Sequence, residues 1–148
     1  MLIHLSESAL RASSDPIAEI LGNSKTIAVV GLSSNPQRPS HQVAAYLQSV
    51  GYRIIPVNPN ETEVLGEKAY ARLEEVPERI DIVDVFRRPE DVPPVADSAV
   101  ALGAKVLWLQ LGIAHAASAE KARAAGLTVI EDACLLVEHK RRRSEVQT

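Results

Sequence analysis

A short polar loop follows the first apolar run of the chain and could bind an anion. The run Thr26–Val30 ends at Gly31. The loop that follows consists of Leu32, Ser33, Ser34 and Asn35. Glycine permits a tight turn, and the loop amides and serine hydroxyls can donate to phosphate oxygens. Ser40, near the start of the next predicted helix, adds a hydroxyl and the positive end of a helix dipole. The loop therefore predicts a pyrophosphate site.

Each serine of this segment also has a structural explanation, because it could satisfy a turn amide or cap the helix. Only the combination of the serines with Gly31 favours phosphate. Arg38 could reach that phosphate or project into water. A dinucleotide fingerprint needs G-x-G-x-x-G, but this chain has serine at the second glycine position and Pro36 at the third. NAD and FAD are therefore disfavoured.

The second apolar run ends in Val57, Asn58 and Pro59, where NAD-binding proteins carry an acidic side chain. A carboxylate would repel a phosphorylated ribose, whereas the neutral amide of Asn58 can donate to a phosphate. The residue suits NADP, with its 2′ phosphate, or coenzyme A, with its 3′ phosphate, and this chemistry does not separate the two. The structural alternative is a plain turn.

Three residues close the third apolar run: Phe86, Arg87 and Arg88. Either arginine could bind phosphate as a bidentate donor, and the phenyl ring could flank an adenine. The structural alternative makes Phe86 the last core residue and pairs the arginines with Glu90 or Asp91.

Alternating strands and helices must position these loops. Five runs rich in valine and isoleucine predict buried strands: Thr26–Val30, Tyr52–Val57, Ile82–Phe86, Val106–Leu109 and Leu127–Ile130. Helical spacing lies between them at Ser40–Val50, Pro89–Leu102 and Ala116–Ala125, with Gly126 as a C-cap. This order predicts an α/β fold: a Rossmann-like, doubly wound parallel sheet of about five strands with flanking helices, in three αβα layers. Ligands bind such sheets at the carboxyl ends of the strands, where the loops meet.

The remaining segments are less regular. An N-cap and first-turn proline at Ser14-Asp15-Pro16 predict a helix over about residues 14–21. Residues 60–77 predict a loop with a brief helix at Leu73–Val76. A last helix through Val137 and His139 is expected to give way to a mobile basic tail over residues 140–148, outside a core of about residues 24–139.

Length and composition favour a single domain over residues 1–148, with a net charge of -3 that gives no reason to expect nucleic acid. The four cations Lys140–Arg143 lack interleaved aromatics and are typical of a solvated terminus. Apolar runs are too short for a bilayer and the start lacks a secretory pattern, so no membrane association and a cytoplasmic location are expected. One cysteine and four scattered histidines predict neither a disulfide nor a metal site.

As an ordered set, four stretches resemble the small stand-alone CoA-binding proteins, which are related to the CoA-binding domain of succinyl-CoA synthetase. They are IAVVGLSSNPQRPSHQVAAYLQSVGYRIIPVNP, DIVDVFRRPED, VLWLQLGI and AGLTVIEDACLLVEH, and the resemblance spans about Ser24 to His139. It implies a Rossmann-like fold and coenzyme A as the ligand. It implies these contacts: Gly31, Leu32, Ser33, Ser34 and Ser40 at the first loop, Val57, Asn58 and Pro59 at the second, and Phe86 and Arg87 at the third.

The resemblance implies a non-catalytic module that binds CoA or acyl-CoA as a carrier, sensor or regulatory partner in acyl-CoA metabolism, with room for a protein partner or a homo-oligomer. The ligase domain usually has a lysine after the Asn-Pro turn, where this chain has Asn60, so Arg87 or Arg88 would have to supply that cation. The ligase also carries a phosphorylatable histidine on a second domain, and ligase activity is not expected of these 148 residues.

Two alternatives involve chemistry. An NADP-dependent oxidoreductase would need a set of catalytic tyrosine, lysine or histidine residues, and no such set can be recognised in the sequence. Thiol chemistry on CoA through Cys134 would use residues after the fourth and fifth strands, including His115 and Glu131-Asp132. The structural alternatives are a buried Cys134 and a helix-capping His115, and Trp108 is expected in the core. Gln110, at the end of the fourth strand, could hydrogen-bond a ligand.

Overall fold

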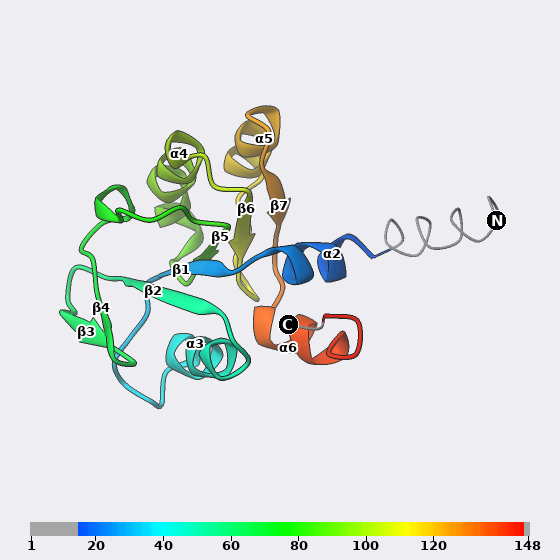
Figure 1. The fold of residues 1–148 in the computed structure, drawn as a ribbon. Coiled ribbons are helices and arrows are strands. Elements are labelled where there is room, and N and C mark those ends of the chain that lie inside the picture. The colour runs from blue at the N-terminus through cyan, green and yellow to red at the C-terminus, as the bar shows by residue number, and fades with distance from the viewer. Residues whose placement is uncertain (1–14, 147–148) are drawn as a thin grey trace.

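Five parallel strands form the central sheet of the computed structural model, which describes residues 15–146 (Figure 1). In the order β2-β1-β5-β6-β7 they are Arg53–Val57, Thr26–Val30, Ile82–Val85, Val106–Leu109 and Thr128–Ile130. Helices α4 (Val92–Leu102) and α5 (Ala116–Ala124) cover one face of the sheet. Helices α2 (Pro16–Asn23), α3 (Pro39–Ser49) and α6 (Leu135–Arg141) cover the other. The predicted three-layer, Rossmann-like fold is confirmed.

The sheet has apolar residues on both faces because helices cover both. Every residue of β5 and β6 is buried, so these strands read as continuous apolar runs rather than as alternating ones. Alternate side chains divide between two cores. Ile27 and Val29 pack against α2, α3 and α6, whereas Ala28 and Val30 pack against the α4 and α5 side.

The register brings three strand ends to one level. Val30, the last residue of β1, is paired with Val57 of β2 on one side and with Val85 of β5 on the other. The chain turns outward from β1 to β2 and then crosses back to β5, so the strand order reverses between β1 and β5. This is the point at which open α/β sheets bind ligands.

Two local features differ from the sequence predictions. Within residues 60–77, the strands β3 (Glu63–Val64) and β4 (Glu67–Lys68) form an antiparallel hairpin where a loop was predicted. The brief helix is confirmed as a 3₁₀ turn, Leu73–Glu75. A second 3₁₀ turn, Pro89–Asp91, precedes α4, so the predicted helix Pro89–Leu102 is divided into two.

The two ends of the described chain are joined to each other. Asp15 caps α2 by accepting a hydrogen bond from the Ala18 amide at 3.1 Å, as predicted, whereas Ser14 lies outside the described residues. Residues 140–146, which were expected to belong to a mobile basic tail, make contacts with the rest of the chain in the structure. Arg142 donates to Asp15 at 2.9 Å and to Glu138 at 2.6 Å, and Val146 is only 5% exposed. Half-buried charge pairing therefore holds this segment against α2; residues 147 and 148 lie outside the described range.

Candidate functional site

A pocket of about 380 Å³ lies at the carboxyl ends of β1, β2 and β5. Its lining residues are Gly31, Ser33, Arg38, Pro39, Ser40, Asn58, Phe86 and Arg87. Every residue in this list except Pro39 is a site candidate predicted from the sequence. We name this hollow the anion pocket, because its lining combines hydroxyl and amide groups with two arginines.

Gly31 allows the strand ends to approach one another closely. Its φ is +90°, in the left-handed region that side chains disfavour. A Cβ at this position would lie 2.4 Å from the backbone oxygen of Phe86, so no larger residue fits unless the backbone directly after β5 moves. The Gly31 amide donates to the carbonyl of Val57 at 2.8 Å, and the Phe86 amide donates to Val30 at 2.9 Å. The three strand ends are thus held at fixed positions below the pocket.

Three amides of the first loop, those of Ser33, Ser34 and Asn35, are bonded within the protein. The Ser33 amide donates to Ser40 Oγ at 3.1 Å, and the Asn35 amide donates to Ser33 Oγ at 3.0 Å. The Ser34 amide donates to the Glu61 carboxylate at 2.8 Å. These three amides are therefore occupied in the structure, whereas the sequence led us to expect loop amides that could donate to phosphate. In this structure the hydroxyls of Ser33 and Ser40 each accept a hydrogen bond from a loop amide, as the structural alternative predicted.

Asn58 joins the first loop to the second. Its Nδ2 donates to the Leu32 carbonyl at 3.0 Å, and its Oδ1 accepts from the Asn60 amide at 3.0 Å. The side chain is only 8% exposed, and Leu32 is completely buried in the core. Asn58 therefore positions the loops, a role that the turn chemistry alone did not reveal.

The two adjacent arginines after β5 have different surroundings. Arg88 is exposed and pairs with Asp91 at 3.2 Å and with Glu90 at 3.8 Å, as the structural alternative predicted. Arg87 lines the anion pocket, and so does Arg38. Among residues 15–146, neither of these two guanidinium groups has a hydrogen bond or an ion pair with a side chain. The pocket therefore contains two cations whose charges no carboxylate of residues 15–146 balances.

A second hollow of about 280 Å³ shares Arg87 with the anion pocket. Its lining residues are Val30, Val57, Pro59, Ala71, Arg72, Leu73, Glu74, Arg87, Pro94, Val95 and Ser98. Most of them are apolar, so this space suits a flat, weakly polar group; we name it the apolar pocket. The predicted residues Val57 and Pro59 lie here rather than in the anion pocket.

A comparison with protein families gives a match over residues 25–140 to the family described as CoA binding domain. The chain belongs to this family. The match covers the whole sheet and both pockets, and it agrees with the resemblance seen in the sequence.

Relatives of this CoA-binding domain include small proteins of similar length. An uncharacterized protein of Bacillus subtilis, YneT, is 48% identical over 123 residues, which is 83% of this chain and 91% of that protein. A solved structure described as cell-free ID.343 from Thermus thermophilus is 44% identical with a TM-score of 0.81, over 85% of this chain and 96% of that one. The alpha subunit of an ADP-forming acetate–CoA ligase II from Pyrococcus furiosus is 38% identical over 61 residues. That match covers 40% of this chain and only 13% of the ligase subunit.

The interior of this CoA-binding domain contains an acidic residue that the sequence predictions missed. Asp84 of β5 is fully buried and accepts a hydrogen bond from Gln110 Nε2 at 2.6 Å. Burial raises the pKa of Asp84 to about 7, although the bond from Gln110 opposes that rise. The other carboxyl oxygen, Oδ2, has no hydrogen-bond partner among the described residues. Gln110, predicted as a ligand contact, is 3% exposed and directs its amide nitrogen to Asp84.

Three residues in or after β6 and β7, Trp108, His115 and Cys134, mostly follow their structural alternatives. His115 caps α5 by accepting from the Ser118 amide at 3.1 Å, and Trp108 is fully buried, so both of these expectations are confirmed. Cys134 is half-buried at the N-cap of α6 and packs against the core. Within residues 15–146, no group of three His, Cys, Asp or Glu side chains could hold a metal ion. In the same range, no helix has the length and apolar character needed to cross a bilayer.

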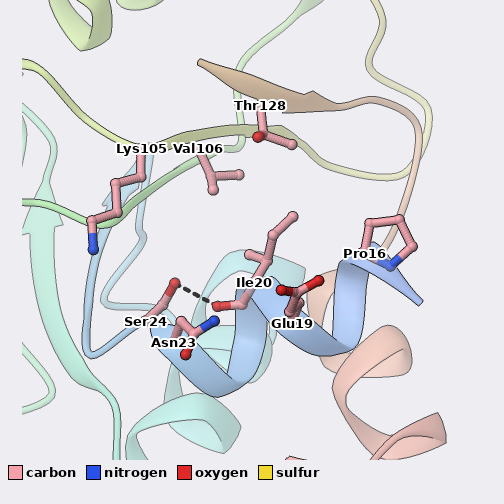
Figure 2. Close-up of a pocket in the computed structure, with 8 residues that line it drawn as sticks. All are labelled: Pro16, Glu19, Ile20, Asn23, Ser24, Lys105, Val106 and Thr128. Carbon is pink, nitrogen blue, oxygen red and sulfur yellow. Dashed lines mark hydrogen bonds between the residues drawn. The ribbon is translucent and has the colours of Figure 1, made fainter. Parts of the chain in front are cut away.

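A further hollow of about 320 Å³ lies at the other end of the strands, between α2 and the first residues of β6 and β7 (Figure 2). Ile20 of α2 faces Val106 and Thr128 across this space. Lys105 is the one cation that lines it, and its ammonium group lies 3.5 Å from the Asp81 carboxylate. The charge balance of this hollow thus differs from that of the anion pocket, where the two arginines have no carboxylate partner in the described part of the chain.

Proposed function

We propose that this domain binds coenzyme A or an acyl-CoA at the carboxyl ends of β1, β2 and β5. It acts as a non-catalytic carrier, sensor or regulatory module rather than as a ligase. The observation that carries the proposal is the pair of guanidinium groups, Arg38 and Arg87, that line one pocket without a carboxylate partner among residues 15–146. Unpaired arginines are the donors best suited to a pyrophosphate.

The start of α3 supports the same site. Pro39 and Ser40 open this helix of 11 residues and line the anion pocket, so the positive end of the helix dipole adds to the two arginines. With the amides of Ser33 and Ser34 already bonded, the arginines and the helix start carry the attraction for phosphate. Arg88, a predicted contact, is not assigned a phosphate, and Ser34 is not assigned one while Glu61 occupies its amide.

The apolar pocket supports an adenine beside that pyrophosphate. Val57, Pro59 and Val95 provide apolar surface, and Arg87 lies between the two pockets, within the lining of both. An arginine in this position can stack on a purine ring or donate to a phosphate of the ribose. CoA carries adenine, a phosphorylated ribose and a pyrophosphate in this order, which matches the succession of the two pockets.

Titration calorimetry with CoA, dephospho-CoA, NAD and NADP tests the proposal. Saturable binding of CoA, tighter than binding of the other three, is expected. A charge-assisted hydrogen bond contributes about 1.5–3 kcal/mol, so Arg87→Gln should weaken CoA binding by about 10- to 100-fold. Arg88→Gln is the matched control: it makes the same change one residue away, at a side chain already paired with Asp91.

Three results would overturn the proposal: no saturable CoA binding, equal binding of all four nucleotides, or equal losses from Arg87→Gln and Arg88→Gln. Preferential binding of NADP would favour the oxidoreductase alternative instead. Raising the salt concentration should weaken CoA binding in wild type more than in Arg87→Gln, because a contact with phosphate is screened by ions.

A further inference from the structure

A carboxylate in the loop after β2 accepts a hydrogen bond from a backbone amide in the loop after β1. Glu61 lies after β2, and its Oε2 accepts from the Ser34 amide at 2.8 Å. The two residues are 27 positions apart, so this is a contact between loops rather than a local turn. The side chain of Asn58 makes the other link, to the Leu32 carbonyl.

This contact differs from the other hydrogen bonds of the first loop. The amides of Ser33 and Asn35 are bonded by neutral hydroxyl groups of the same segment. Only Ser34 is bonded by a charged group. Within residues 15–146, Glu61 has no ion pair that would balance its negative charge.

A carboxylate that accepts a backbone amide uses the donor that a phosphate oxygen would use. Ser33 and Arg38, on either side of this amide in the chain, both line the anion pocket. A phosphate bound there would experience the negative charge of Glu61, either through repulsion or through competition for Ser34. In both cases the carboxylate opposes the binding of an anion.

We propose that Glu61 is a specificity-determining residue that competes with the ligand phosphate for the first loop. This inference rests on the proposed function, because it assigns the phosphates of CoA to the anion pocket. In the free protein Glu61 holds the loop through Ser34, and binding of a polyanion displaces it. The residue therefore raises the Kd of every phosphate ligand and excludes weakly charged ones.

Glu61→Gln tests the charge, because glutamine retains an oxygen that can accept from Ser34. CoA should bind this variant about fivefold or more tightly than wild type, since a like charge beside the phosphate has been removed. Glu61→Ala removes both the charge and the hydrogen bond. It should also tighten CoA binding, and it should accelerate hydrogen exchange of the Ser34 amide in the free protein. Glu63→Gln is the matched control, with the same change of net charge at an exposed position in β3, and should bind CoA like wild type.

Equal affinity of wild type and Glu61→Gln for CoA would overturn the inference, as would weaker binding by Glu61→Ala, which would make Glu61 a support of the loop instead. A wild type that does not bind CoA overturns the proposed function. Inorganic pyrophosphate, titrated in parallel, then decides the inference by itself: tighter binding by Glu61→Gln supports it, and no difference refutes it.

Discussion

Replacing Asp84 by asparagine tests the energetic cost of the buried carboxyl group in the middle of the sheet. Asp84 is fully buried, and the pKa rises from the ordinary value of 3.8 to about 7 because a charged carboxylate is poorly solvated there. Its Oδ1 accepts from Gln110, and its Oδ2 has no partner among residues 15–146. Asparagine can retain the bond from Gln110 and carries no charge, so it imitates the protonated acid.

The sign of the effect follows from proton binding. Between pH 3.8 and about pH 7 the folded protein retains the Asp84 proton, whereas the unfolded chain releases it. The contribution of this group to the free energy of unfolding is therefore fully present below pH 3.8 and is lost as the pH rises toward 7. Each pH unit costs about 1.4 kcal/mol, so the total loss is on the order of 4 kcal/mol. Asp84→Asn should avoid this loss.

Urea unfolding at pH 5, 6, 7 and 8 measures the effect, with fluorescence of the single tryptophan as the reporter. Trp108 is fully buried and is paired with Asp84 across β5 and β6. The quantity to compare at each pH is the difference in unfolding free energy between Asp84→Asn and wild type, because the other ionisable groups cancel. The variant should gain stability relative to wild type as the pH rises to 7. A difference that stays constant from pH 5 to pH 8 would refute the reasoning.

Asp81, which directly precedes β5, provides a control of opposite sign. Burial acts to raise its pKa, but hydrogen bonds from the Lys25 and Thr26 amides and the charge of Lys105 outweigh burial, so the pKa is lowered. Its stabilising contribution is present above the ordinary value of 3.8 and is lost only in more acidic solution. Asp81→Asn should therefore destabilise the protein by a similar amount at pH 5 and pH 8, unlike Asp84→Asn.

Two further substitutions test the backbone and a second buried group. Gly31→Ala should lower the free energy of unfolding by at least about 1–3 kcal/mol in urea unfolding, because the left-handed φ and the Phe86 carbonyl both oppose a Cβ. Gly22→Ala, in α2 with open space around it, should instead raise stability by up to about 1 kcal/mol, and equal losses at the two glycines would contradict this account. His139 is buried and bonded to the Tyr46 hydroxyl at 2.7 Å, and burial lowers its pKa, so the stability it contributes above pH 6.5 is lost as the pH falls below that value. His139→Gln should remove this loss, and an unchanged acid profile in urea unfolding would show that the ring has the same pKa in the folded and unfolded protein, which would contradict this account.

The strands could be predicted from the sequence because most of their residues are buried, on both faces of the sheet. Val106–Leu109 and Thr26–Val30 are short apolar runs, and the structure has strands at these residues. The hairpin was missed for the opposite reason. Its strands, Glu63–Val64 and Glu67–Lys68, have two residues each and are mostly polar, and Leu65 takes an unusual positive φ of 55° in the turn. Two residues are too few to show the alternation of apolar and polar side chains by which a strand is recognised.

The site was predictable to the extent that topology alone determines it. Gly31, Asn58 and Arg87 follow three strands whose ends must meet in a doubly wound sheet, and all three line one pocket. The partners of the polar groups were not predictable. Whether Ser34 is free or Arg88 is paired depends on long-range packing and on side-chain rotamers, which local sequence does not specify. Asp84 was missed because it lies within an apolar run, although an acid in such a run is itself a sign of a buried polar pair.

The absence of an acid after β2 has a structural cause that does not depend on the ligand. Asn58 both donates to the Leu32 carbonyl and accepts from the Asn60 amide, and only a side chain with a donor and an acceptor can make both bonds. An ionised aspartate could accept from Asn60 but would face the Leu32 carbonyl with a second oxygen. The link between the two loops would then become a repulsion inside a nearly buried site. The neutral residue is thus required by the loop that it supports, and the proposal of a phosphorylated ligand rests instead on Arg38 and Arg87, which line the same pocket without a carboxylate partner among residues 15–146.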